Sequence, residues 1–144
     1  YEYRGVLCIC PMYGVKGARW LIEYLEYHKS IGIAHVHLYA FDSITEEPLS
    51  AVLKHYMKSG FVTPHDWSHS ASKGFTKDAT YEHAKWTAQT DCLLRSRGVA
   101  DFVLYNDIDE VLMPSGGTIG PSLKHCHENH LKTSKTVLGC SYNS

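Results

Sequence analysis

The sequence predicts an α/β fold, an open and mostly parallel sheet with helices on both faces. Short apolar runs rich in Val, Leu and Ile alternate with longer segments in which apolar side chains recur at helical spacing. Glycine and proline residues separate these segments. Because the chain has 144 residues, we expect residues 1–144 to form a single domain.

The predicted elements alternate between strand and helix. In order, they are a strand at 4–14, a helix at 18–32, a strand at 34–41, a helix opened by Pro48, a strand at 61–67, a helix at 80–97 and a strand from 100 onward. Gly32, Gly60 and Gly98 stand where the three helices are expected to end. The third strand is expected at an edge of the sheet, because Pro64 cannot donate a ladder hydrogen bond.

Composition and chain ends limit the possible partners. A net charge of -1 and a pI near 6.8 provide no long-range field for nucleic acid, so no nucleic-acid partner is expected. The apolar runs are far shorter than the ~20 residues that a membrane helix needs. The chain starts at Tyr1 and ends in TVLGCSYNS, which reads as an interrupted strand. We therefore expect a fragment truncated on its C-terminal side, with any membrane anchor outside it.

The cysteines give no recognisable framework. There are five, an odd number, and no pair has the CxxC spacing of a zinc or redox site. Cys8 and Cys10 alternate within an apolar run and are expected to be small core residues. The redox compartment stays open.

Acidic side chains gather at the expected carboxyl end of the fourth strand. Asp107, Asp109 and Glu110 stand between the apolar runs FVLY and VLMP. Open parallel sheets bind ligands at the carboxyl ends of their strands, where residues 11–14 and Asp42 are also expected. Carboxylates this close repel one another unless a cation neutralises them. The cluster therefore indicates either a cation site or a solvated acidic turn.

The metal interpretation depends on an extended backbone. In a strand, Asp107 and Asp109 point to one side and Ile108 to the opposite, buried side. Mn²⁺ or Mg²⁺ would accept these oxygens and leave positions open for phosphate oxygens. Such a metal neutralises a diphosphate and helps it to leave. From the residues alone, a metal site and a solvated strand cap are supported about equally.

A second chemistry uses a similar motif. The stretch DIDEV satisfies the Asp-x-Asp-x-Val/Thr pattern of haloacid-dehalogenase-like phosphohydrolases, in which Asp107 would be the nucleophile. In those proteins the motif usually ends the first strand of the domain. Here several strand–helix units precede it, so its position favours the metal and diphosphate site.

Four segments in order carry a family resemblance. They are VLCICPMYG, WLIEYLEYHKSIGIAHVHLY, VLKHYMKSGFVTPHDW and TDCLLRSRGVADFVLYNDIDEVLMP. Together, over residues 6–114, they resemble glycosyltransferase family 92, first described as a domain of unknown function, and more loosely the family 2-like transferases with a Rossmann-like GT-A fold. One departure concerns the second strand, where Tyr39 and Ala40 replace a usual Tyr-Asp pair and the nearest acid is Asp42.

The resemblance implies an activity and a location. It implies an inverting transferase that moves a hexose, galactose or a relative, from a UDP-sugar to a glycan or another hydroxyl acceptor. Residues 1–144 would be its N-terminal nucleotide-sugar-binding part. It also implies a Golgi or other endomembrane location through an anchor upstream of Tyr1. A catalytically inactive binding module stays open as an alternative.

The resemblance also implies residue roles. Asp107 and Asp109 would map to the metal and donor-diphosphate motif, with Asp109 the more direct Mn²⁺ (or Mg²⁺) ligand, Asp107 nearer the ribose and Glu110 assisting. Further donor-binding candidates are Asp42 and the residues expected to line the nucleotide cleft, Pro11, Met12 and Tyr13. Arg95 is another candidate if its helix faces the cleft; the alternative is an exposed surface arginine. The catalytic carboxylate base of an inverting enzyme has no candidate up to Ser144 and is expected beyond it.

Two histidine features favour structural interpretations. His28, at the apolar edge of its helix, is expected to be packed and hydrogen-bonded. The HCHENH stretch, residues 125–130, does not place four donors on one helix face and is expected to be a hydrated helix surface.

Overall fold

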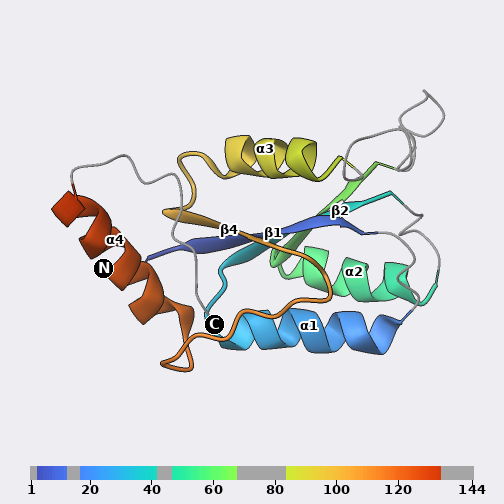
Figure 1. Ribbon diagram of the computed structural model, residues 1–144. Helices are drawn as coiled ribbons and strands as arrows, with labels where there is room; N and C mark the ends of the chain where they lie inside the picture. The colour runs from blue at the N-terminus through green and yellow to red at the C-terminus, as the bar shows by residue number, and fades with distance from the viewer. Residues whose placement is uncertain (1–2, 13–16, 42–46, 68–83, 134–144) are drawn as a thin grey trace.

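The computed structural model describes residues 3–12, 17–41, 47–67 and 84–133. Four strands and four helices alternate within these ranges (Figure 1). They are β1 (Gly5–Met12), α1 (Ala18–Ser30), β2 (His35–Ala40), α2 (Leu49–Lys58), β3 (Val62–Asp66), α3 (Lys85–Ser96), β4 (Phe102–Asn106) and α4 (Ile119–Thr133).

The strands form one parallel sheet in the order β3-β2-β1-β4. The predicted fold class, an open α/β sheet, is therefore confirmed, and so is the edge position of the strand that contains Pro64. Chain order runs outward from β1 through β2 to β3 and then returns to place β4 on the other side of β1. The chain therefore crosses from β1 to β2 in one direction along the sheet and from β3 back past β1 to β4 in the other. Doubly wound sheets bind ligands at the point where this direction reverses, here between β1 and β4.

Helices cover both faces of the sheet. Figure 1 shows α1 and α2 on one side and α3 on the other. The larger core lies on the α1–α2 side; α1 contributes Leu21, Tyr24, Leu25 and His28, a spacing that places them on one helical stripe. The smaller core, under α3, joins Tyr39 of β2 to Ala88. Ile119 and Leu123 of α4 pack into the larger core.

The predicted helix ends are confirmed. Gly32, Gly60 and Gly98 follow α1, α2 and α3 with φ of 97°, 74° and 78°, the left-handed region that other L-residues rarely adopt. The helix expected at 80–97 is described from Lys85 to Ser96, and positions 80–83 lie outside the described residues.

A disulfide joins the two layers of the smaller core. Cys8 of β1 and Cys92 of α3 are bonded, and both are buried. The expectation that Cys8 is a small core residue is confirmed, whereas local spacing did not predict its disulfide, because the partners are 84 positions apart. Cys10 is buried, as expected, and is a free thiol, whereas Cys126 is disulfide-bonded.

The chain's described helices include none that is both long and apolar enough to cross a membrane. The terminal TVLGCSYNS, expected to begin a strand, lies outside the described residues.

Candidate functional site

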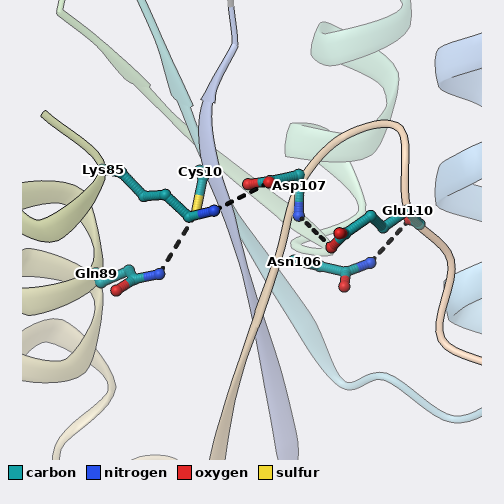
Figure 2. Close-up of polar contacts among 6 residues, drawn as sticks. All are labelled: Cys10, Lys85, Gln89, Asn106, Asp107 and Glu110. Carbon is teal, nitrogen blue, oxygen red and sulfur yellow. Dashed lines mark hydrogen bonds and ion pairs between the residues drawn. The ribbon is translucent and has the colours of Figure 1, made fainter. Parts of the chain in front are cut away.

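The acidic motif forms a turn at the carboxyl end of β4 (Figure 2). The strand ends at Asn106, and the backbone N–H of Glu110 donates to the Asp107 carbonyl at 3.1 Å. The Glu110 carboxylate in turn accepts from the backbone N–H of Asp107 at 3.2 Å. The extended backbone assumed for the Asp-Ile-Asp stretch is therefore wrong: paired hydrogen bonds close a turn directly after the last ladder residue.

The turn still separates its acidic side chains from the core. Ile108 packs against the larger core, whereas Asp109 and Glu110 are exposed. Asn106 is buried, and its side-chain amide donates to the Glu110 carbonyl at 2.8 Å and to the Tyr24 hydroxyl at 3.4 Å. Both ends of the turn are thus tied to the sheet and to α1, so its acidic oxygens have a defined position.

Lys85 is the basic partner of this turn. Its Nζ lies 2.9 Å from Oδ2 of Asp107, and the two side chains are 36% and 38% exposed. The hydrogen bond to Asp107 raises the pKa of Lys85, so its ammonium is charged at neutral pH. The sequence analysis missed this residue; the available signal was a lysine near the start of a helix that must begin at the carboxyl edge of a parallel sheet.

A neutral thiol lies beside the ion pair. Gln89, one helical turn after Lys85, places its side-chain nitrogen 3.7 Å from Sγ of Cys10 (Figure 2). Burial raises the pKa of the Cys10 thiol to about 11. Cys10 therefore stays protonated at neutral pH and is a packing group, because the nucleophile in cysteine chemistry is the thiolate.

Helix α1 holds the chain that leaves the turn. The Tyr27 hydroxyl donates to the Leu112 carbonyl at 2.7 Å, and the Leu112 N–H donates to Nε2 of His28 at 3.4 Å. Nδ1 of His28 lies 2.8 Å from the Tyr24 carbonyl. His28 is buried, and burial lowers its pKa, so the neutral ring bridges two backbone groups. The expected packed and hydrogen-bonded histidine is confirmed.

Arg95 lies apart from the acidic turn. Its Nε donates to Oδ2 of Asp91 at 2.6 Å, and the same oxygen accepts from the Tyr39 hydroxyl at 2.7 Å. Arg95 follows Lys85 by ten positions on α3, which corresponds to about 15 Å along the helix axis. The structure therefore brings Lys85, and not Arg95, to Asp107.

The remaining donor-binding candidates are only partly described. Met12 is 3% exposed and its side chain belongs to the larger core, so it does not line an open cleft. Pro11 is placed in β1 through its backbone. Tyr13 and Asp42 lie outside the described residues.

The carboxylates of the acidic turn fit a metal ion that arrives already bound to phosphate oxygens and water. Among the residues that the structure describes, no three His, Cys, Asp or Glu side chains come together as a metal site. On α4, His125 is exposed and His127 is half-buried, and the interpretation of residues 125–130 as a hydrated helix surface stays a prediction. Asp109 is exposed at the turn and Asp107 is close by in the sequence. One or two carboxylates completed by phosphate oxygens and water are the usual protein contribution to a Mg²⁺ site at a nucleotide.

Comparison with known proteins identifies the family. The profile of glycosyltransferase family 92 matches residues 3–142. The chain belongs to glycosyltransferase family 92. The Caenorhabditis elegans beta-1,4-galactosyltransferase galt-1 is 26% identical over 115 residues, 79% of this chain and 26% of that protein. The family 92 protein F13G3.3 from the same organism is 30% identical over 115 residues, 76% of this chain and 22% of its own length.

A plant relative extends the match. The family 92 protein RCOM_0530710 of Ricinus communis is 27% identical over 136 residues, 93% of this chain and 22% of that protein. The chain thus spans about a quarter of the length of the curated relatives it matches. Family 92 membership favours the transferase interpretation of the acidic motif over the phosphohydrolase interpretation with Asp107 as nucleophile.

Proposed function

We propose that residues 1–144 form the N-terminal, nucleotide-sugar-binding part of an inverting, metal-assisted glycosyltransferase. The enzyme moves a galactose-like hexose from a UDP-sugar to a glycan or another hydroxyl acceptor. The observation that carries this proposal is the acidic turn 107–110 at the carboxyl end of β4, beside β1 at the switch point of the sheet, in a chain of family 92.

The turn supplies the groups that a donor needs. Asp109, exposed at the tip of the turn, would hold Mn²⁺ or Mg²⁺ directly, with Asp107 and Glu110 close to the bound donor. When bound, the metal neutralises the diphosphate and so makes it a better leaving group. The chain's own contribution is to fix the turn through Asn106 and through the α1 contacts to Leu112.

The donor sugar and the location are proposed from the family membership of the chain. A relative named as a beta-1,4-galactosyltransferase supports a galactose-like donor. Transfer with inversion joins the acceptor oxygen to the anomeric carbon as the bond from that carbon to the diphosphate oxygen breaks. The acceptor proton passes to a carboxylate base. On the same basis we propose a Golgi or other endomembrane location.

The experiment is a transfer assay on the full-length protein. UDP-galactose, UDP-glucose and UDP-N-acetylglucosamine are offered with a panel of glycans, with Mn²⁺ or with a chelator. We expect metal-dependent transfer of one hexose, a loss of about 10²-fold or more in Asp109→Asn, and no change in Glu128→Gln, an exposed carboxylate of α4. Binding of UDP without transfer to any acceptor would indicate an inactive binding module, and neither binding nor transfer would refute the proposal.

A further inference from the structure

We infer that Lys85 is a donor-binding residue whose ammonium exchanges partners, from Asp107 in the unliganded protein to the diphosphate of the bound nucleotide sugar. This inference rests on the function proposed above and adds a residue to the same site. The observation behind it is the 2.9 Å ion pair between Lys85 Nζ and Asp107 Oδ2, which joins a cation of α3 to the turn that is expected to receive a metal.

The backbone of Lys85 is held in place beside the turn. Helix α3 is bonded to β1 through the disulfide between Cys8 and Cys92, four residues before the end of the helix. Ala88, one turn after Lys85, is 1% exposed in the smaller core. A change of partner therefore requires rotation of the lysine side chain and no movement of the helix. At 36% exposure the side chain has room to make that rotation.

Two sources of positive potential coincide beside Asp107. Lys85 is the first residue of a twelve-residue helix, so the positive end of the helix dipole lies at the same place as the ammonium. No side chain caps the N-terminus of α3 in the part of the chain that the structure describes. An ammonium together with the backbone N–H groups at the start of a helix is an arrangement suited to phosphate oxygens. Asp107 pairs with the ammonium and Glu110 adds a second negative charge nearby, so a metal at these carboxylates would leave the ammonium and the helix end available to phosphate.

The exchange predicts effects of opposite sign on two ligands. Without nucleotide, Lys85 and a divalent cation compete for Asp107, so removing the ammonium strengthens the binding of metal alone. With nucleotide, the ammonium contacts the diphosphate, so removing it weakens nucleotide binding. A lysine that merely supports the shape of the turn would weaken both when it is removed.

The test uses the full-length protein in four forms: wild type, Lys85→Met, Lys85→Arg and Lys124→Met. Lys124 is the matched control, because it is an exposed lysine paired with Glu128 on α4. Calorimetry measures the affinity for UDP at saturating Mn²⁺. Electron paramagnetic resonance of free Mn²⁺ measures the affinity for the metal without nucleotide.

We expect Lys85→Met to lose about tenfold in UDP affinity and to gain about two- to fivefold in Mn²⁺ affinity. Lys85→Arg keeps the UDP affinity within about threefold, and Lys124→Met changes neither. Wild-type binding of UDP combined with unchanged UDP affinity in Lys85→Met would overturn the role of Lys85 alone. A fall in both affinities would show a structural role and would also overturn it. No UDP binding by the wild type would refute the proposed function itself.

Discussion

The hydroxyl of Tyr27 donates a 2.7 Å hydrogen bond to the carbonyl of Leu112, across 85 positions of sequence. Leu112 is the second residue after the acidic turn, and its N–H is held by His28 from the same helix. Helix α1 therefore fixes the exit of the turn through both the backbone N–H and the carbonyl of Leu112. Because Asn106 fixes the entrance, the position of the acidic side chains depends on α1 as well as on β4.

Replacement of Tyr27 by Phe tests this contact. It removes the hydroxyl and leaves the part-buried Leu112 carbonyl without that donor, so we expect a loss of about 1 kcal/mol in unfolding free energy. UDP affinity is expected to fall a few-fold, because the turn is less restrained. Tyr105→Phe is the matched control: its hydroxyl also donates to a carbonyl, that of Gln89, but at an exposed position. Equal effects in calorimetry for the two variants would show that the contact with Leu112 is not special.

The buried disulfide is expected to stabilise the fold strongly. Cys8 and Cys92 close a loop of 84 positions, and the double variant Cys8→Ala/Cys92→Ala should lose about 2–5 kcal/mol. Thermal unfolding with and without reductant measures the effect. Reductant should lower the Tm of the wild type and of Cys10→Ala by several degrees, and that of the double variant less. An equal decrease in all three would place the stabilisation in another disulfide, such as that of Cys126.

Three histidines form a second polar feature, on the face of β2 and β3 that α3 covers in part. Nδ1 of His37 lies 3.0 Å from Nε2 of His65, and the His35 ring centroid lies 4.9 Å from that of His37. Burial and the neighbouring charges of His35 and His65 lower the pKa of His37 to about 4. Burial and Arg95 also lower the pKa of His65, whereas Asp91 opposes this. The folded protein therefore keeps the rings of His37 and His65 neutral at neutral pH.

This arrangement predicts loss of stability in acid. The unfolded chain binds a proton at His37 below a pKa of about 6.5, but the folded chain does so only near 4. Between these values the unfolded state binds more protons, so unfolding free energy decreases as pH falls from about 6.5 to about 4. His37→Gln should flatten this decrease, and His125→Gln, on the exposed surface of α4, should not. An unchanged pH profile of Tm in His37→Gln would contradict the account.

Ser96 gives a prediction in the opposite direction. Its hydroxyl is buried and has no hydrogen-bond partner among the residues that the structure describes. Removing an unsatisfied buried hydroxyl relieves its desolvation cost, so Ser96→Ala should keep or raise the unfolding free energy by up to about 1 kcal/mol. Urea unfolding measures this; a loss of more than about 1 kcal/mol would mean that the hydroxyl has a partner in the native protein.

Local patterns were sufficient to predict the fold. Alternating apolar runs and helical stripes predicted the four described strands and α1, α2 and α3, but did not place α4 in the element order, and Gly32, Gly60 and Gly98 predicted three helix ends. Pro64 predicted the edge strand for a physical reason, the missing N–H. Each of these signals lies within one element, so it can be read without knowing what the element packs against.

The site depended on contacts that no local pattern contains. Lys85 and Asp107 are 22 positions apart and meet only because α3 and β4 return to one edge of the sheet. The turn at 107–110 was mistaken for extended chain because Ile108 faces the core in both conformations, so the alternation of polar and apolar residues does not distinguish them. The family resemblance made Arg95 a donor-binding candidate. In the structure Arg95 pairs with Asp91 near the C-terminal end of α3, away from Lys85 and the acidic turn.

The central claim is that the turn 107–110 binds the donor diphosphate through a metal. Its most direct measurement is a crystal structure of the full-length protein with UDP and Mn²⁺, with anomalous diffraction used to locate the manganese. The account predicts a manganese within about 2.5 Å of a carboxylate oxygen of Asp109 or Asp107, also bound to the UDP diphosphate. Manganese and UDP bound away from the carboxyl end of β4, or UDP bound there without metal, would contradict it.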